Sequence, residues 1–196
     1  MPRVSKSVGD KLSIIKTPLF PKKFKIKRVN PKGEGFALLG IGGNIGDTIK
    51  IFEKLIIKLN RYPDIKVVAT SIILKNPPFG YEKQDDFYNS LILIKTSLTP
   101  KQLLKRVLKI EDDFGRKRSF KNAPRTLDID IIFFNQKIIQ TKDLRLPHPF
   151  WRERDSVLIP LKYMQNRLKS KKISKILKKL LTNPKNKDII PPQIKR

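Results

Sequence analysis

The most constraining feature of the chain is a pair of acidic residues inside an otherwise apolar segment. Residues 127–134 read Leu-Asp-Ile-Asp-Ile-Ile-Phe-Phe. The β-branched and aromatic residues predict a strand, on which residues two apart share a face. Asp128 and Asp130 would therefore point the same way, with their backbones roughly 6–7 Å apart. Two like charges among apolar residues are costly unless cations neutralise them.

This acid pair has two interpretations. Converging carboxylates suit hard cations such as Mg²⁺, and together with a triphosphate they can build a two-metal site. Alternatively, the segment is an edge strand whose polar face presents Asp128 and Asp130 to solvent. Strand alternation would place Ile132 and Phe134 on that same face. Such large apolar residues fit poorly on a solvent-exposed face, so the pattern favours the metal site.

A cationic loop precedes the acid pair. Its five basic residues are Arg116, Lys117, Arg118, Lys121 and Arg125. Arginines directed at phosphates beside a metal-binding acid pair are what phosphoryl-type transfer needs, because positioning and charge neutralisation supply most of its catalysis. In a chain with a formal net charge of +27, a solvated basic loop is the competing interpretation.

The elements around these residues alternate in type. Apolar runs predict strands at residues 36–41, 65–74, 87–96 and 126–134. A helix capped by Asp47 follows the first strand, and a helix that begins with a capping box at Thr99 and ends at Gly115 follows the third. The order β-α-β-β-α-β predicts an α+β, ferredoxin-like (split βαβ) fold, with both helices on one face of an antiparallel-rich sheet.

Three zones divide the chain. Residues 1–34 are a basic extension without a sustained period, 35–165 form the globular domain, and 166–196 hold a C-terminal helix and a basic tail. The apolar stripe of that helix is short, so we expect it to dock on the domain rather than on a membrane. The chain has no cysteine and no apolar run long enough to span a bilayer. We therefore expect a cytoplasmic protein.

Several other residues are candidates for a site. Phe87 and Asn89 lie two apart on the third strand and would present a ring and an amide to one side, as a flat heterocycle requires. His148, the only histidine, lies between two prolines, and Glu111 continues the buried stripe of the second helix. For each of these residues, packing or solvent exposure is the alternative interpretation.

Eight segments, in this order along the chain, resemble the 6-hydroxymethyl-7,8-dihydropterin pyrophosphokinase family. The resemblance extends from about residue 37 to residue 161, and its most specific string is PRTLDIDI. The segments are residues 42–47 (GGNIGD), 76–80 (NPPFG), 87–89 (FYN), 110–111 (IE), 115–116 (GR), 124–131 (PRTLDIDI), 146–149 (LPHP) and 157–161 (VLIPL).

The resemblance implies a ferredoxin-like enzyme of folate biosynthesis that transfers pyrophosphate from ATP to the hydroxymethyl group of the pterin and releases AMP. It implies that Asp128 and Asp130 hold two Mg²⁺ ions, and that Arg116 and Arg125 lie on mobile loops that close over ATP. Further residues implied at the ATP site are Glu111, Arg118, His148 and Arg154. The residues implied at the pterin site are Pro77, Pro78, Phe79, Gly80, Phe87 and Asn89, of which Phe87 stacks on the pterin and Asn89 binds its edge.

The chain departs from the family pattern around the pterin. Asn122 and Ala123 replace an aromatic residue and a glycine of the loop, and Ser156 replaces a second aromatic residue that usually stacks on the pterin. Pro149 stands where tyrosine is frequent. We hypothesise that Phe150 or Trp151 supplies the missing aromatic face.

The expected partners are ATP and the hydroxymethyl pterin, bound by a monomer, with no nucleic acid or membrane partner. An RNA-binding module is the main rival, because it shares the ferredoxin-like order and fits the charge. The sheet segments lack the basic-aromatic signature of such modules, and two acids would repel a phosphate backbone. A pyrophosphokinase relative without activity, acting as a binding partner, is the third interpretation.

Overall fold

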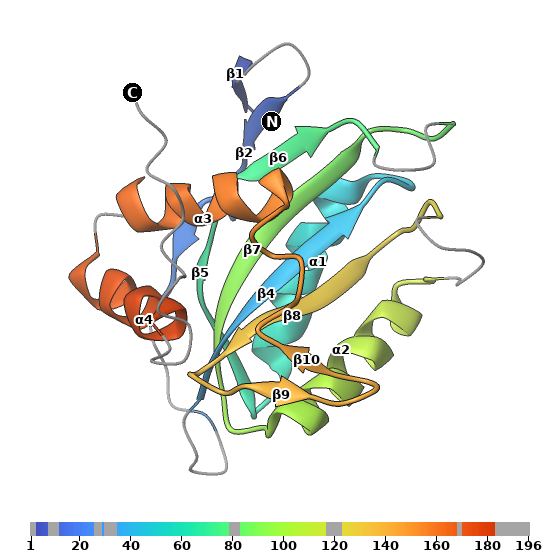
Figure 1. Cartoon of the computed structure of the whole chain (residues 1–196). Helices are drawn as coiled ribbons and strands as arrows, with labels where there is room; N and C mark the ends of the chain where they lie inside the picture. The colour runs from blue at the N-terminus through green and yellow to red at the C-terminus, as the bar shows by residue number, and fades with distance from the viewer. Residues whose placement is uncertain are drawn as a thin grey trace.

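An antiparallel sheet forms the centre of the computed structural model (Figure 1). The structure describes residues 3–7 (backbone), 12–25, 29, 35–78, 83–116, 123–167 and 170–182. The main path of the sheet is β1 (Arg3–Ser7), β2 (Ser13–Lys16), β6 (Ile73–Asn76), β7 (Phe87–Thr96), β4 (Gly35–Gly43) and β8 (Asp128–Phe134). Off this path, β5 (Ile65–Thr70) pairs with β7 and with β3 (Lys22–Lys23), while β9 (Ile139–Gln140) and β10 (Arg145–Leu146) form a separate pair.

Helices cover both faces of the sheet. The helices belong to two hydrophobic clusters. Residues of α1 (Thr48–Arg61) and α2 (Pro100–Asp113) lie in the first cluster, and residues of α3 (Asp155–Arg167) and α4 (Lys171–Leu181) lie in the second. Figure 1 shows these pairs on opposite sides of the sheet. A mixed α/β fold with an antiparallel sheet, and with α1 and α2 on one face, is therefore confirmed.

The predicted helix signals lie where the helices begin and end. The Asp47 side chain accepts a hydrogen bond from the Lys50 amide, and Thr99 forms a reciprocal capping box with Gln102. Gly115 follows α2 with a φ of +76°, a conformation that glycine adopts without strain. These local signals were readable because each depends on residues close in sequence.

The second predicted strand, residues 65–74, is in fact two strands. Ser71 lies between β5 and β6, and its hydroxyl accepts a hydrogen bond from the Leu91 amide of β7 at 2.8 Å. β7 therefore pairs with β5 and then with β6, and the Ser71 side chain bonds to β7 at the break between them. The hydropathy of the segment does not reveal this break.

Part of the N-terminal extension belongs to the sheet. β2 pairs with β6, and β3 pairs with β5. Ile15 and Phe20 are buried, with the Phe20 ring centroid 6.1 Å from that of Phe52 in α1. No strand was predicted here, because the few apolar residues show no period of their own and are ordered by distant partners.

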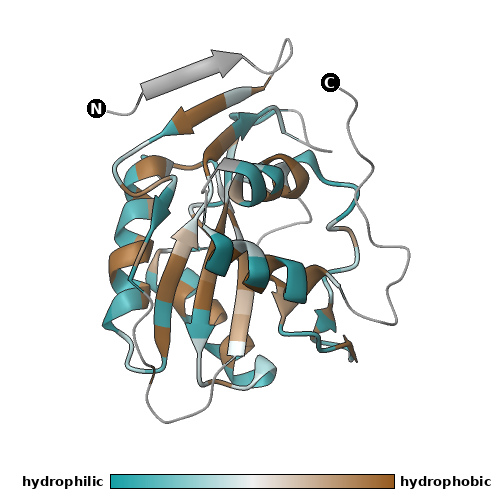
Figure 2. Cartoon of the chain, turned by 90° about the vertical axis from the view of Figure 1, so that its left-hand side faces the viewer, coloured by the Kyte–Doolittle hydropathy of each residue, from teal (hydrophilic) through white to brown (hydrophobic). Residues whose placement is uncertain are grey.

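The C-terminal helix docks on the sheet, as predicted. Its buried residues Ile173, Leu177, Leu180 and Leu181 join the second cluster. Figure 2 shows hydrophilic and hydrophobic residues on different sides of the helices on this face. No helix in the described part of the chain combines the length and hydropathy needed to cross a membrane.

A β-bulge in β8 corrects one detail of the acid strand. Leu38 of β4 pairs with Phe133 and Leu39 pairs with Ile131, so Ile132 is the extra residue. Ile132 lies on the face of the second cluster, as the two aspartates do by alternation, but Phe134 lies in the first cluster. The prediction that Phe134 shares the face of the aspartates is therefore wrong.

Candidate active site

Two glycines of β4 lie beside the two aspartates of β8. Gly42 pairs with Asp128 and Gly40 pairs with Asp130, while Gly42 also pairs with Asn89 on the other side. A Cβ at Gly42 would lie 2.9 Å from the Asn89 side-chain oxygen, closer than real contacts allow. Gly40 and Gly42 therefore leave a strip of β4 backbone without side chains between the carboxylates and the Asn89 amide, which we call the glycine floor. Neither Gly40 nor Gly42 was predicted as a site residue, although the Gly-rich end of the strand was visible in the sequence.

Asp128 is surrounded by guanidinium groups. Arg116 Nη1 lies 2.7 Å from its Oδ1, and Arg125 Nε lies 3.0 Å from its Oδ2. The Asp128 side chain is only 19% exposed, so solvent screens these pairs less than it screens surface ion pairs. The structure thus brings together the side chains of Arg116, Arg125 and Asp128.

Glu111 holds Arg116 from the other side. Its side chain is 2% exposed, one oxygen pairs with the Arg116 guanidinium, and the other accepts a hydrogen bond from the Ile129 amide at 2.6 Å. Burial raises the pKa of Glu111, whereas the Ile129 amide and the Arg116 charge oppose that rise. The predicted burial of Glu111 is confirmed. Its contacts make it a support for Arg116 and for the start of β8.

Asp130 has a looser environment. Its side chain is 41% exposed, with Arg154 Nη1 at 3.7 Å and His148 Nε2 at 3.9 Å from Oδ2. Withdrawal from water and the neighbouring Asp128 charge raise the pKa of Asp130 above the usual range of an aspartate. Asp130 is therefore the less neutralised member of the pair.

His148 lies beside this carboxylate in a largely uncharged form. Burial, followed by the positive charge of Arg154, lowers its pKa to about 4. Its backbone amide donates to the Ile132 carbonyl at 2.9 Å, which fixes the loop against β8. His148 therefore lies beside Asp130 as a neutral ring.

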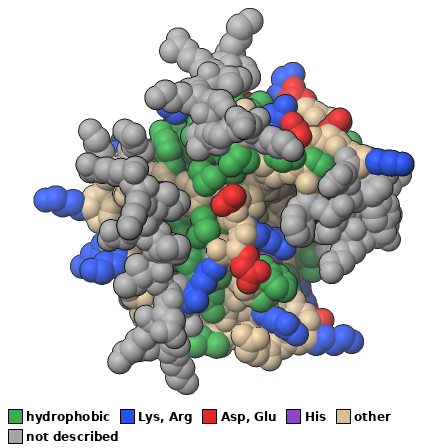
Figure 3. All heavy atoms as spheres, turned by 45° about the horizontal axis from the view of Figure 1, so that its top comes forward, with side chains coloured by type: hydrophobic (Ala, Val, Ile, Leu, Met, Phe, Trp, Pro, Cys, Tyr) green, Lys and Arg blue, Asp and Glu red, His purple; other side chains and the backbone are tan. Residues whose placement is uncertain are grey.

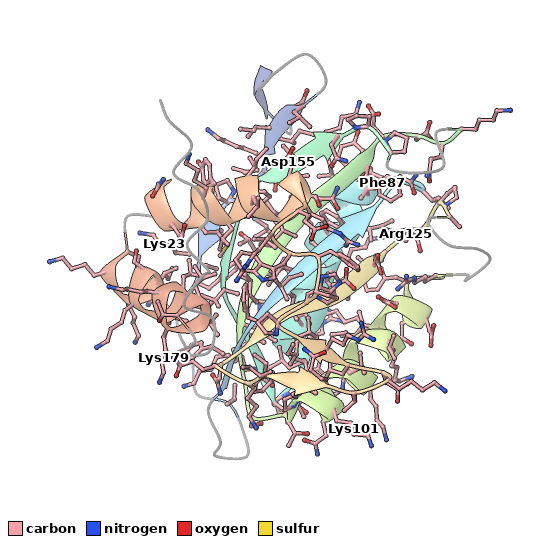
Figure 4. The ribbon with its side chains drawn as sticks, viewed as in Figure 1. Lys23, Phe87, Lys101, Arg125, Asp155 and Lys179 are labelled. Carbon is pink, nitrogen blue, oxygen red and sulfur yellow. The ribbon has the colours of Figure 1, made fainter. Side chains whose placement is uncertain are left out.

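Arg125 is held by both its backbone and its side chain. Its guanidinium carbon lies 4.9 Å from the centre of the Phe87 ring, a cation–π contact. Figure 4 shows Phe87 and Arg125 close together at the same end of the sheet. The Arg125 backbone amide donates a hydrogen bond to the Asn44 side-chain oxygen at 2.9 Å. The Arg125 carbonyl accepts one from the Asn44 backbone amide, also at 2.9 Å.

Asn44 is a site residue that sequence reasoning missed. It is 6% exposed, and its side-chain amide donates to the Gln84 side chain and the Asp85 carbonyl. One side chain thereby joins the turn after β4, the segment before β7 and the segment that carries Arg125. Only its place in the GGNIGD segment hinted at this role.

The predicted pterin residues are partly described. The Asn89 amide donates to the Asn76 side chain at 2.7 Å, and the Asn76 amide donates to the Pro77 carbonyl at 2.8 Å. Pro77 and Pro78 are partly exposed next to this pair. Phe79 and Gly80, like Arg118 of the ATP set, lie outside the described residues.

The hypothesis that Trp151 replaces the missing aromatic face is wrong. Trp151 is 3% exposed and packs edge-on against Phe133 in the second cluster, with ring centroids 5.0 Å apart. Phe150 is 52% exposed, and its ring centroid lies 6.3 Å from that of His148. Only Phe150 keeps a surface available for stacking.

The site contains polar atoms without hydrogen-bond partners. Buried Arg125 Nε and His148 Nδ1 have none, and the contact of Arg125 Nε with Asp128 is an ion pair only. Such orphaned groups near carboxylates point to a missing polar ligand. Figure 3 shows acidic and basic side chains side by side on the face that comes forward when the top of Figure 1 is turned toward the viewer.

The donor set fits a hard cation that arrives with its own ligands. Among the described residues, no group of three or more acidic, histidine or cysteine side chains could hold a metal ion. Asp128 and Asp130 supply hard carboxylate oxygens, whereas both oxygens of Glu111 already have partners. Mg²⁺ is usually held by one or two carboxylates, waters and substrate phosphates, so this sparse set suits Mg²⁺ bound to a triphosphate.

Arginines beside carboxylates that could hold Mg²⁺ are typical of sites that position and neutralise phosphate groups. Residues 38–166 match the model of the 7,8-dihydro-6-hydroxymethylpterin-pyrophosphokinase (HPPK) family. This match spans more than half of the chain, and the protein belongs to that family.

Individual relatives agree with the family match. The chain is 47% identical over 154 residues to the 2-amino-4-hydroxy-6-hydroxymethyldihydropteridine pyrophosphokinase of Helicobacter pylori, covering 78% of this chain and 93% of that protein. It is 44% identical over 125 residues to the Campylobacter jejuni enzyme of the same name, covering 64% of this chain and 80% of that protein. With the Aquifex aeolicus enzyme, also of that name, identity is 41% over 123 residues, covering 63% and 76%.

The buried, neutral state of His148 can be measured directly, because the chain has one histidine. In the ligand-free protein, NMR titration of the ring proton should give a midpoint near 4, well below the 6.5 of a free side chain. The sign follows from burial: folding disfavours the charged ring, so this group destabilises the fold as pH falls from 6.5 toward 4. Arg154→Gln should raise the midpoint without restoring 6.5, and a wild-type midpoint at or above 6.5 would contradict the described environment.

The glycine floor predicts a selective effect of Gly42→Ala. The added methyl group must displace the Asn89 amide, which lies 2.9 Å from the new Cβ position. We expect pterin affinity to fall about tenfold, as for a lost, well-placed hydrogen bond, while ATP affinity changes less. Isothermal titration of each ligand measures both affinities. Unchanged pterin affinity in Gly42→Ala would show that Asn89 has no role there.

Proposed function

We propose that the protein transfers pyrophosphate from ATP to the hydroxymethyl group of 6-hydroxymethyl-7,8-dihydropterin and releases AMP, as a step of folate biosynthesis. The family to which the chain belongs is named for this activity. The observation that carries the proposal to this chain is the β8 aspartate pair, which lies within 4 Å of Arg116, Arg125 and Arg154.

In this proposal, Asp128 and Asp130 hold the two Mg²⁺ ions of the reaction. The ions would neutralise charge on the triphosphate and orient it. The sparse donor set and the exposed oxygens of Asp130 support this assignment. The two carboxylates are enough to hold the ions, because the phosphates supply further ligands.

The arginines bind the phosphates in this proposal. Arg116, Arg125 and Arg154 lie on the segments around the carboxylates, and their guanidinium forks match phosphate oxygens. The pterin hydroxyl oxygen attacks the β-phosphorus and its proton passes to water, while the bond from that phosphorus to the α-phosphate oxygen breaks and AMP leaves with that oxygen. Neutralisation of the charge on the leaving AMP is the main contribution that these side chains can make.

The neutral His148 ring adds a hydrogen-bond donor at the same site. Its orphaned Nδ1 is free of protein partners in the described part of the chain, and a phosphate oxygen would satisfy it when that nitrogen carries the proton. Arg118 stays a predicted member of the ATP site. Glu111 acts through Arg116, because its two oxygens already have partners.

The pterin lies over the glycine floor in this proposal. Asn89 supplies an edge hydrogen bond, and Phe87 supplies an aromatic face after Arg125 moves from it. Pro77, Pro78, Phe79 and Gly80 would border the ring. Phe150 is the remaining candidate for the second aromatic face, since Ser156 has none.

We also assign the central sheet to the ferredoxin-like class. The order β8-β4-β7-β5, antiparallel throughout, with α1 and α2 on one face, supports this assignment. The cytoplasmic location and the monomeric state remain predictions. An RNA-binding role finds no support at the sheet edge, where the acidic pair would repel phosphates that lack bound metal ions.

The activity is tested by AMP formation from ATP with Mg²⁺, with and without the hydroxymethyl pterin. We expect pterin-dependent AMP, and Asp130→Asn should lower the rate at least 100-fold, because a metal-binding oxygen is lost from the site. Asp112→Asn, an exposed aspartate at the end of α2, is the matched control and should retain wild-type turnover. A folded wild-type protein that releases no AMP would favour the relative without activity, and wild-type turnover in Asp130→Asn would exclude the metal role.

A further inference from the structure

The two aspartates of the site differ in how fully their charge is already neutralised. Both carboxylate oxygens of Asp128 contact a guanidinium nitrogen, at 2.7 Å and 3.0 Å. Among the described residues, the guanidinium nearest to Asp130 is farther away, with Arg154 Nη1 at 3.7 Å, and the Asp130 side chain is 41% exposed. A cation that needs both aspartates therefore finds Asp130 accessible and Asp128 covered.

Among the described residues, the acidic and basic side chains of the ligand-free site are equal in number. Glu111, Asp128 and Asp130 supply three carboxylates, and Arg116, Arg125 and Arg154 supply three guanidinium groups. A free divalent cation would add two positive charges to a balanced site and would compete with two arginines for Asp128. A triphosphate with bound metal ions brings its own negative oxygens, which give the displaced arginines new partners.

Both arginines have a second anchor that does not depend on Asp128. Arg116 pairs with buried Glu111, which is fixed by the Ile129 amide. The Arg125 backbone is held by Asn44, and its guanidinium rests on Phe87. Before the pterin binds, release from Asp128 therefore leaves each side chain positioned beside the site.

The Arg125 contact is also incomplete. Its Nε is a buried donor without a hydrogen-bond acceptor although it lies 3.0 Å from the Asp128 oxygen. A hydrogen bond to a charged phosphate oxygen would satisfy this donor. Exchange of carboxylate for phosphate thus improves the environment of Arg125.

We propose that Arg116 and Arg125 act as built-in counter-cations of Asp128, which make the site selective for a metal–triphosphate complex over the free divalent cation. Both arginines leave the carboxylate when the complex binds and transfer to its phosphates. This proposal rests on the metal role of Asp128 and Asp130 given above. It assigns the arginines a second role, in the ligand-free protein, apart from the transfer reaction.

The test measures binding of Mn²⁺ to the nucleotide-free protein, by the loss of the free-ion signal in electron paramagnetic resonance. Wild type should bind Mn²⁺ weakly, and Arg125→Gln should bind it about tenfold more tightly, because one positive charge beside the ligand oxygen is removed. With α,β-methylene-ATP present the sign should reverse: Arg125→Gln should bind the Mn²⁺–nucleotide complex more weakly than wild type.

Arg154→Gln is the matched control, because it removes the same charge near Asp130 and leaves Asp128 covered. It should tighten Mn²⁺ binding less than Arg125→Gln does. An equal gain in Mn²⁺ affinity in both variants would show that removal of any nearby positive charge has this effect, and would overturn the proposal. Tight Mn²⁺ binding by nucleotide-free wild type would overturn it as well.

A second variant guards against a folding defect at Arg116. Arg116→Gln alone leaves Glu111 buried without its cation, so Glu111→Gln is combined with it. The double variant should also tighten Mn²⁺ binding without nucleotide, and no gain would contradict the role of Arg116. Failure of wild type to form AMP would reject the enzymatic function, whereas these binding results would still decide the counter-cation role.

Discussion

The site depends on a chain of charges that runs from the buried Glu111 through Arg116 to Asp128. Glu111 is nearly inaccessible to water, and such a carboxylate is stable only with close partners. Its partners include the guanidinium of Arg116 and the amide of Ile129. One buried acid therefore fixes both the arginine that faces the site and the first residues of the strand that carries the aspartates.

The backbone around this charge chain is held by close approaches that large side chains would prevent. A Cβ at Gly43 would lie 2.5 Å from the Thr126 carbonyl oxygen, so the segment before β8 can approach β4 this closely only where β4 has a glycine. Asn44 then joins that segment to the residues before β7. The phosphate side and the pterin side of the proposed site are thus parts of one hydrogen-bonded frame, and Arg125 contacts both through Asp128 and Phe87.

Sequence reasoning predicted what depends on short-range patterns. The strand with its acid pair, the caps at Asp47 and Thr99, and the burial of Glu111 follow from spacing within one element. The strand formed by residues 13–16 was missed, because its pairing partner lies in β6, about sixty residues away. The burial of Trp151 was also missed, since its partner Phe133 lies on another element and only the fold brings the rings together. The bulge at Ile132 depends on register with β4 and leaves no local sign.

The central claim is that Asp128 and Asp130 jointly hold the metal ions that accompany ATP. A crystal structure of the full chain with Mg²⁺ and α,β-methylene-ATP tests it most directly. The account predicts metal ions bound to oxygens of both aspartates at about 2.0–2.1 Å, the usual Mg²⁺–oxygen distance, with the guanidinium groups of Arg116 and Arg125 on phosphate oxygens. A bound nucleotide whose metal ions contact neither aspartate, with both arginines still on Asp128, would contradict it.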